Sequence, residues 1–158
     1  MIREETKSTY VGSMTTAPVT YQVVTGWNDD DIIALYQSAG WWREYYDPSG
    51  IAPLIKGSFI FAVGIDTGTG RAVAMGRIIS DRVSIGYIHD LCVLTEMRGM
   101  HVGAGILDFL IKAAKAAGLS SLYLVAEPDT QSFYEKSGFI SDNGLIFLTQ
   151  NPDGQYET

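Results

Sequence analysis

The chain consists of apolar stretches of strand length and amphipathic stretches of helix length, with turns rich in Gly or Asp between them. Short apolar or alternating runs bounded by turn residues are typical of β-strands. On this pattern the predicted strands are residues 21–25, 58–65, 72–80, 87–94, 122–126 and 145–149. The intervening segment Asp-Thr-Gly-Thr-Gly at 66–70 predicts a hairpin turn between the second strand and the third.

Four stretches have apolar residues at helical spacing. The predicted helices are residues 30–39, 53–56, 106–117 and 131–137. Asn28 or Asp29 is expected to cap the first helix, and Asp129 is the candidate N-cap of the last one. Gly118 is expected to end the third helix, because glycine favours the backbone found after a helix C-terminus.

The order of these elements predicts an α/β (α+β) fold. Its core would be a mixed central β-sheet of about six or seven strands flanked by about four helices. Residues 1–18 are polar and lack periodicity, so we expect a flexible N-terminal arm, with a short added strand as the alternative. Residues 19–158 then form a single domain, which is large enough to bury one core.

A Gly-rich turn at residues 98–105 lies between a predicted strand and a predicted helix. Such a turn directs several backbone N–H groups and the positive end of the helix dipole toward one point, which suits a phosphate group. The turn is not a Walker A loop, because the chain contains no Gly-x-x-x-x-Gly-Lys-Ser/Thr run. Its glycines also lack the spacing of the dinucleotide-binding fingerprint.

Two segments resemble the GNAT acetyltransferases. Arg98 and Gly103 match the first and last positions of the family's Arg/Gln-x-x-Gly-x-Gly/Ala loop, which binds the pyrophosphate of acetyl-CoA. His101 stands where the family usually has its first glycine, so a left-handed backbone there would be strained. Residues 133–139, Phe-Tyr-Glu-Lys-Ser-Gly-Phe, resemble a second signature of the family. The resemblance extends over nearly the whole chain from Tyr21 onward and implies the GNAT fold.

The resemblance implies acetyl-CoA as co-substrate. In the family, the strand before the loop splays away from its neighbour and leaves unpaired backbone groups for pantetheine. A backbone N–H near Leu91 or Val93 would then polarise the thioester carbonyl. The implied cofactor-binding residues are Leu91, Cys92, Val93, Arg98, Gly99, Met100, His101, Val102, Gly103 and Ala104. The alternative is an ordinary core strand in which every N–H group is paired.

Two side chains are candidates for catalytic proton transfer. Tyr134 matches the general acid of the family, which gives its proton to the sulfur of CoA. The alternative for Tyr134 is simple packing on an amphipathic helix. His89 resembles a histidine of the aralkylamine acetyltransferase branch that helps remove the amine proton. The alternatives for His89 are a hydrogen-bonded histidine in a partly buried strand, or a water chain as the base.

The period of a regular strand assigns the neighbours of His89 to two faces. Tyr87, His89 and Leu91 would share one face, so Tyr87 would line the same pocket. Asp90 and Cys92 would face the other way. We therefore expect Asp90 to be structural and Cys92 to be a buried apolar cysteine that is not a nucleophile.

Aromatic residues concentrate between the first two predicted helices, where the family has its acceptor channel. The candidate substrate-binding residues are Trp41, Trp42, Tyr45 and Tyr87. Aromatic rings beside Glu44 and Asp47 would suit a cationic or aromatic amine. The alternative is that Trp41 and Trp42 pack in the core.

The formal net charge of −7 disfavours nucleic acid and anionic membranes as partners. One cysteine excludes an internal disulfide and suits the reducing cytoplasm, and one cysteine with two histidines does not suggest a metal site. The first residues are charged and no apolar run is of membrane-spanning length, so neither a signal peptide nor a membrane anchor is expected. Homodimers are common for the fold, and nothing in the sequence requires one.

The predicted function is a cytoplasmic N-acetyltransferase. It would move an acetyl group from acetyl-CoA to a primary amine of a small molecule or peptide, by direct transfer in a ternary complex. The alternative is a non-catalytic acyl-CoA-binding or sensor module of the same fold, which would not need Tyr134 as an acid near the sulfur.

Overall fold

The computed structural model describes residues 18–142 and 144–150 of the 158-residue chain. The expected arm at residues 1–18 therefore lies almost entirely outside the described residues. The elements are β1 (Val19–Val23), α1 (Asp29–Ser38), α2 (Ile51–Gly57), β2 (Ile60–Asp66), β3 (Ala72–Ser80), β4 (Ile85–Val93), α3 (Val102–Ala116), β5 (Ser121–Tyr123) and α4 (Gln131–Glu135). In this part of the chain, no helix combines the length and apolar character needed to cross a membrane.

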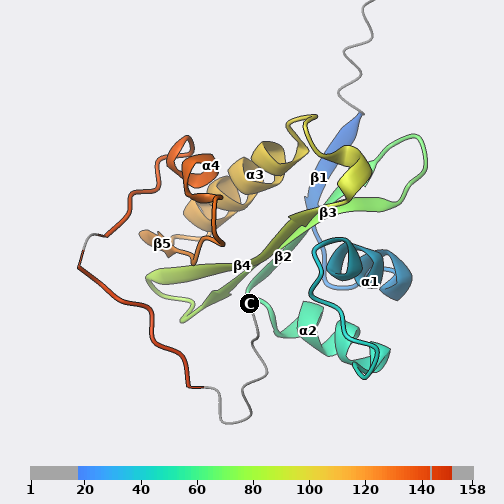
Figure 1. Ribbon diagram of the computed structural model, residues 1–158, viewed down its shortest axis with the longest axis horizontal. Helices are drawn as coiled ribbons and strands as arrows, with labels where there is room; N and C mark the ends of the chain where they lie inside the picture. Colours follow the sequence, from blue (N-terminus) through green and yellow to red (C-terminus); the bar gives the residue numbers. More distant parts are fainter. Residues whose placement is uncertain (1–17, 143, 151–158) are drawn as a thin grey trace, which may run out of the picture.

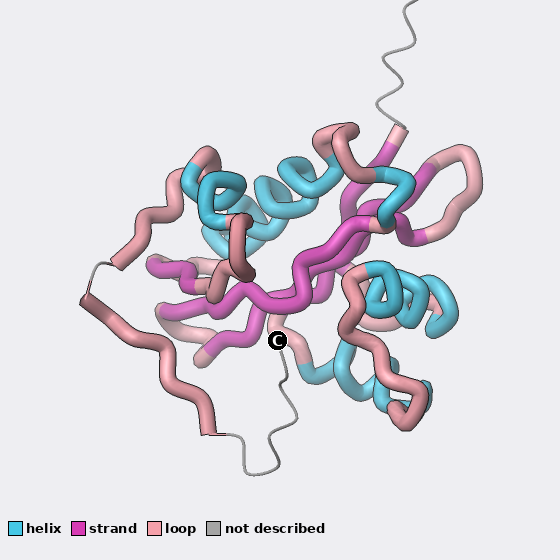
Figure 2. Tube along the Cα trace, in the orientation of Figure 1, coloured by secondary structure: helices cyan, strands magenta, loops and turns pink. Residues whose placement is uncertain are grey.

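The strands form one mixed sheet in the order β1-β2-β3-β4-β5 (Figure 1). The first four strands are antiparallel to their neighbours, and β5 is parallel to β4. Helices α3 and α4 lie on one side of the sheet, and α1 and α2 lie on the other (Figures 1 and 2). The predicted fold class is confirmed by this mixed sheet with its four α-helices.

The sheet has five strands among the described residues, fewer than the six or seven predicted. The predicted strand at 145–149 is wrong, because only Leu145 makes an isolated bridge and the rest of the segment is coil. Its run of consecutive apolar residues has no in–out alternation, so no register against a neighbouring strand is specified. The predicted strand at 122–126 is also shorter, since β5 ends at Tyr123 and is only partly buried.

The core lies on both sides of the sheet. On one side Ile32 and Leu35 of α1 are fully buried, and on the other side Ile106, Leu107 and Leu110 of α3 are fully buried. Their spacing of three and four residues places them on one face of each helix. Both helices are thereby packed firmly against β3 and β4, the strands that carry the candidate site.

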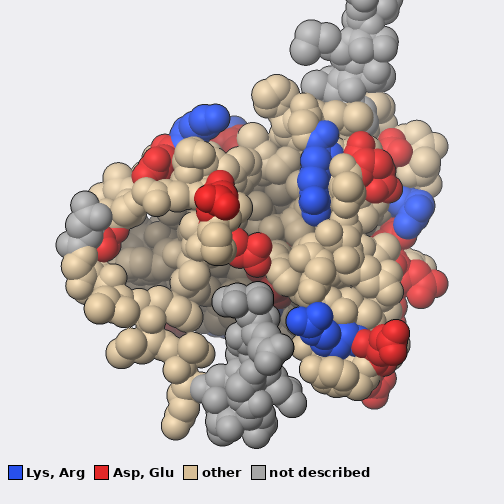
Figure 3. Space-filling model, in the orientation of Figure 1, with Lys and Arg blue, Asp and Glu red and all other residues tan. Residues whose placement is uncertain are grey.

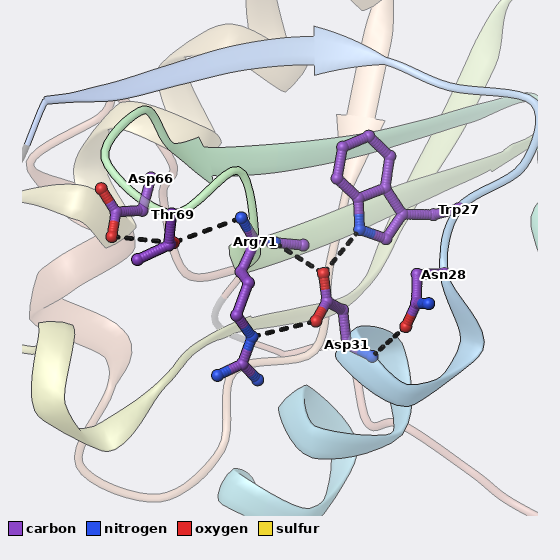
Figure 4. A network of polar contacts seen from close by, with 7 residues as sticks. Trp27, Asn28, Asp31, Asp66, Thr69 and Arg71 are labelled. Carbon is purple, nitrogen blue, oxygen red and sulfur yellow. Dashed lines mark hydrogen bonds and ion pairs between the residues drawn. The ribbon is translucent and has the colours of Figure 1, made fainter.

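A buried carboxylate joins the start of α1 to the β2–β3 hairpin (Figure 4). Asp31 accepts hydrogen bonds from Trp27 Nε1 (3.1 Å), Arg71 Nε (3.1 Å) and the backbone N–H of Ala72 (3.0 Å). Asn28, one of the two predicted candidates, caps the helix by accepting from the Asp31 N–H (3.1 Å). Burial alone would raise the pKa of Asp31, but these donors lower it. The network holds α1 in a defined position relative to the sheet.

Candidate active site

The sheet opens between β4 and β5. Among the described residues, β4 pairs with β5 only through Ile85–Tyr87 and Ser121–Tyr123, although β4 continues to Val93. The edge of β4 that carries Leu91 and Val93 therefore has no β5 residue beside it. The opening agrees with the splayed strand that the sequence resemblance implies, rather than with a core strand paired on both sides.

A β-bulge interrupts β4 at the same place. Met75 pairs with Cys92, and Arg77 pairs with His89, so Gly76 lies opposite both Asp90 and Leu91. Asp90 adopts a left-handed backbone, with φ +53°. A bulge of this kind adds one residue to one strand and shifts the alternation of its side chains.

The bulge contradicts the assignment of side chains to faces that the sequence analysis made from a regular two-residue alternation. Asp90 turns toward α1 and accepts a hydrogen bond from Tyr36, so it shares a face with His89. Leu91 instead lies toward α3, beside Gly76 and the side chain of Leu110. The predictions that Leu91 shares a face with His89 and that Asp90 faces away from it are therefore wrong. A regular period of two cannot hold across an inserted residue.

Cys92 also lies on the α1 side, not away from His89 as parity predicted. Its thiol is buried and donates to the carbonyl of Leu35 (3.6 Å). Burial, with the charge of Asp90 in addition, raises the pKa of this thiol well above its usual value. A buried thiol that stays protonated is a poor nucleophile, in keeping with the apolar role predicted for it.

Four polar side chains meet at the bulge. Asp90 Oδ2 accepts from Arg77 Nε (2.6 Å) and from the Tyr36 hydroxyl (2.7 Å), and Asp90 Oδ1 lies 2.7 Å from His89 Nδ1. Burial alone would raise the pKa of Asp90, but the hydrogen bonds from His89 and Tyr36 and the charges of His89 and Arg77 outweigh it and hold the pKa at about 2. Asp90 is thus a partly buried carboxylate with three partners, which fits the structural role expected for it, although the sequence analysis assigned it to the wrong face.

The predicted aromatic residues divide into two groups. Trp41 and Trp42 are half-buried and both lie against Tyr36, with ring centroids 6.4 Å apart in each case. Tyr45 is 68% exposed and lies farther out, against the ring of Tyr46, with ring centroids 5.0 Å apart. Tyr87 lies beside His89, with ring centroids 5.8 Å apart. The tryptophans therefore pack on the core beside Tyr36, a partner of Asp90, and their role in substrate binding stays a prediction.

Glu127 is a second residue that the sequence analysis did not assign to the site. It follows β5 and accepts a hydrogen bond from Trp41 Nε1 (3.0 Å), which links the loop after α1 to the loop after β5. Glu127 is also close enough to Tyr134 to affect its pKa. The sequence could have indicated Glu127 by its position in a loop after a strand, because functional side chains often lie on such loops.

Tyr134 lies on the short helix α4. The N-cap of this helix is Thr130, whose hydroxyl donates to the carbonyl of Glu127 (2.7 Å), and not Asp129 as predicted. The Tyr134 ring packs edge-on against Phe133 (5.0 Å) and Phe139 (6.1 Å). Burial, and then the negative charge of Glu127, raises the pKa of Tyr134. The phenol therefore keeps its proton at neutral pH and can act as an acid.

A cavity of about 600 Å³ connects Tyr134 with both strands of the opening. Its wall includes Tyr87 of β4, Leu122 and Tyr123 of β5, and residues of the segment that follows α4. Its acidic lining residues are Glu127, Asp129, Glu135 and Asp142, and no lysine or arginine lines it among the described residues. Figure 3 shows the surface hollowed in this region, with acidic side chains around the hollow.

The Gly-rich turn forms the N-terminal end of α3. The helix begins at Val102 and not at residue 106, so Gly103 and Gly105 lie in its first turns. Gly99 and His101 both adopt left-handed backbone, with φ +76° and +61°. The position of His101 thus has the conformation that favours glycine, which explains why a glycine is usual there.

The same turn provides free donors and a firm anchor. The first intrahelical bond runs from Gly105 N–H to the His101 carbonyl (3.0 Å), so the N–H groups of Val102, Gly103 and Ala104 precede the helical ladder. Arg98 anchors the turn by donating to the carbonyls of Val93 (3.4 Å) and Ser38 (3.1 Å). Three free N–H groups at a helix N-terminus fit a pyrophosphate group. The helix begins four residues earlier than predicted, and the predicted free N–H groups are present at its start.

Comparisons with known proteins agree with this geometry. Residues 22–139 match the profile described as Acetyltransferase (GNAT) family. The uncharacterized N-acetyltransferase ycf52 of Porphyra purpurea is 32% identical over 108 residues, which cover 68% of this chain and 62% of that protein. Glucosamine 6-phosphate N-acetyltransferase 1 of Oryza sativa subsp. japonica is 30% identical over 94 residues, which cover 54% of this chain and 57% of that protein.

A solved structure shows the same fold. The crystal structure of glucosamine-6-phosphate N-acetyltransferase from Arabidopsis thaliana superposes with a TM-score of 0.67 and 18% identity, over 85% of this chain and 99% of that one. In sequence, however, the matches span less than two thirds of the length of the curated relatives.

Proposed function

Because this chain belongs to the GNAT acetyltransferase family, we propose that it transfers the acetyl group of acetyl-CoA directly to a primary amine while both are bound. The observation that carries the proposal is the opening between β4 and β5. The free N–H groups of α3 follow β4 along the chain, and the cavity lined by Tyr134 reaches both strands of the opening. A carrier held by these N–H groups and along the edge of β4 would direct its reacting end toward Tyr134.

The binding roles follow from the backbone. The N–H groups of Val102, Gly103 and Ala104 would bind the pyrophosphate of acetyl-CoA. The unpaired edge of β4 at Leu91–Val93 would hold the pantetheine arm, and one N–H there would polarise the carbonyl of the acetyl group. Bound acetyl-CoA supplies a thioester, whose carbonyl carbon is open to attack by a neutral amine.

The proton transfers use two side chains. His89 takes a proton from the ammonium group, which leaves an electron pair on nitrogen to form the new C–N bond. As the C–S bond breaks, Tyr134 donates its phenolic proton to the departing sulfur. The second proton lost by the amine nitrogen restores the phenol, so one proton is released to solvent overall.

The acidic and aromatic lining of the cavity supports a cationic acceptor. Four carboxylates and several aromatic rings surround the space beside Tyr134. Carboxylates attract an ammonium group, and aromatic faces bind cations and apolar groups. The acceptor that we propose is accordingly a primary amine of a small molecule or a peptide.

The first experiment is a calorimetric titration of the protein with acetyl-CoA, with ATP as the control ligand. We expect acetyl-CoA to bind and ATP not to bind, because the pantetheine groove adds to the phosphate site. Release of free CoA in the presence of a panel of amines then identifies the acceptor. Failure to bind acetyl-CoA would contradict the proposed function.

Tyr134→Phe separates an enzyme from a non-catalytic acyl-CoA-binding module. The variant keeps the ring but loses the acidic proton, so kcat should fall by about 10- to 1,000-fold with acetyl-CoA affinity little changed. Tyr46→Phe is the matched control, because it removes a phenol that no proposed step uses. Equal kcat in both variants would exclude Tyr134 as the acid.

A further inference from the structure

The hydrogen-bond network at the β4 bulge connects the proposed base, His89, to a carboxylate that is itself held by two other side chains. Asp90 is a partly buried carboxylate, 13% exposed, whose two oxygens have separate partners. Oδ2 accepts from Arg77 Nε and from the Tyr36 hydroxyl, and Oδ1 faces His89 Nδ1 at 2.7 Å. The side chain of His89 is 48% exposed, so the rest of its ring is open to a ligand.

The contact between His89 and Asp90 depends on the bulge. Adjacent residues of a regular strand point to opposite faces, so their side chains do not meet. Here the left-handed backbone of Asp90 turns its carboxylate to the side of His89. Left-handed backbone at a residue other than glycine is unfavourable, and such strain is concentrated at functional sites.

The contact also determines which nitrogen of the ring carries hydrogen. An ionised carboxylate can only accept, so a hydrogen bond at this distance requires a hydrogen on Nδ1. A neutral imidazole then has a free electron pair on Nε2. Arg77 Nη2 is 3.5 Å from Nδ1 and could donate only to a bare Nδ1, so it competes with Asp90 for this nitrogen, but the Asp90 contact is shorter by 0.8 Å.

We propose that Asp90 is a positioning residue that holds neutral His89 as the Nδ1–H tautomer and presents Nε2 as the base for the acceptor amine. The inference rests on the proposed acetyl transfer. In the step, an N–H bond of the ammonium group breaks and the Nε2–H bond forms, while the electron pair stays on the amine nitrogen. The resulting imidazolium is stabilised by the Asp90 carboxylate and later releases its proton to solvent.

The tautomer can be measured without any substrate. The chain contains two histidines, His89 and His101, so nitrogen-15 NMR of the imidazoles with a His101→Gly variant for assignment is unambiguous. At a pH where His89 is neutral, we expect Nδ1 to show the shift of a protonated nitrogen and Nε2 that of a bare nitrogen. The opposite assignment in the wild-type protein would overturn the proposal.

Asp90→Asn tests the cause of the tautomer. Asparagine tolerates left-handed backbone, and its amide can donate to Nδ1, so we expect His89 to switch to the Nε2–H tautomer. Tyr36→Phe is the matched control, because it removes one hydrogen bond to Oδ2 and leaves Oδ1 in place. Retention of Nδ1–H in a folded Asp90→Asn variant would show that Asp90 does not hold the ring.

Kinetics test the role of the base. With an identified amine, Asp90→Asn should lower kcat by about 100-fold with the KM for acetyl-CoA unchanged. His89→Gln should lower kcat as much, and the double variant should fall no further, because the two residues act as a unit. Additive losses, or wild-type kcat in Asp90→Asn, would overturn the base role. Absence of any acetyl transfer by the wild-type protein would instead refute the proposed function, while the NMR result would still decide whether Asp90 holds the ring.

Discussion

At the scale of single residues, two non-glycine positions with left-handed backbone lie at the two ends of the candidate site. Asp90 turns a carboxylate toward His89, and His101 directly precedes the N–H groups of Val102, Gly103 and Ala104, which would bind phosphate in the proposed function. The sequence signalled the second case, because a histidine replaces a glycine of the family loop. It could not signal the first, because the bulge at Asp90 depends on how β4 pairs with β3.

His101→Gly should raise the free energy of unfolding by about 1 kcal/mol, since glycine adopts φ +61° without the steric cost that histidine has. Acetyl-CoA affinity should stay the same or increase. Denaturant unfolding and calorimetric titration measure the two effects. Gly99→Ala, which places a side chain at φ +76°, is the control and should destabilise the protein. Weaker acetyl-CoA binding by His101→Gly would mean that the imidazole itself contacts phosphate.

At the scale of secondary-structure elements, the sequence predicted most of the helices and strands. The bounds of β3 are those predicted, and α1 is capped by Asn28, one of the two predicted candidates. Periodicity reveals such elements because each packs one face on the core. It placed the start of α3 four residues late, because glycines in a first helical turn look like a loop in the sequence.

Gly105 shows what one of these glycines does within α3. A Cβ at this position would clash with the hydroxyl of Tyr21, which donates to the carbonyl of Val102 (3.2 Å). Gly105→Ala should therefore lower the free energy of unfolding by about 1–3 kcal/mol, although alanine is the better helix former.

Gly103→Ala is the control for that prediction. Its Cβ would meet Phe133 and Val93 only at 3.5–3.6 Å, which is ordinary van der Waals contact. Urea unfolding of both variants makes the comparison. Equal stability would show that α3 does not approach β1 as closely as the structure indicates.

At the scale of the whole molecule, helices cover both sides of the sheet. Side chains from the two sides come together at the opening between β4 and β5. Trp41 from the loop after α1 reaches Glu127 after β5, and Tyr134 contacts the same region from α4. These residues are far apart in the sequence. Their proximity comes from the parallel crossover through α3 that connects β4 to β5.

The segment after α4 lies outside the core, contrary to the predicted strand. Leu148 is 85% exposed, so Leu148→Ser should change the free energy of unfolding by less than about 0.5 kcal/mol. Leu110→Ala, at a fully buried position, should cost about 2–5 kcal/mol. Thermal or urea unfolding distinguishes the two. A large loss in Leu148→Ser would mean that the segment packs as the strand predicted from its composition.

The sequence by itself determined the class of fold, the order of most elements and the position of the Gly-rich turn, because periodicity, capping residues and short motifs are local properties of the chain. Only the tertiary structure decided which side chains meet. The register of β3 against β4 creates the bulge at Asp90, and that single inserted residue moves Asp90 and Cys92 to the face of His89. Register depends on pairing with another strand, so no pattern within β4 could specify it.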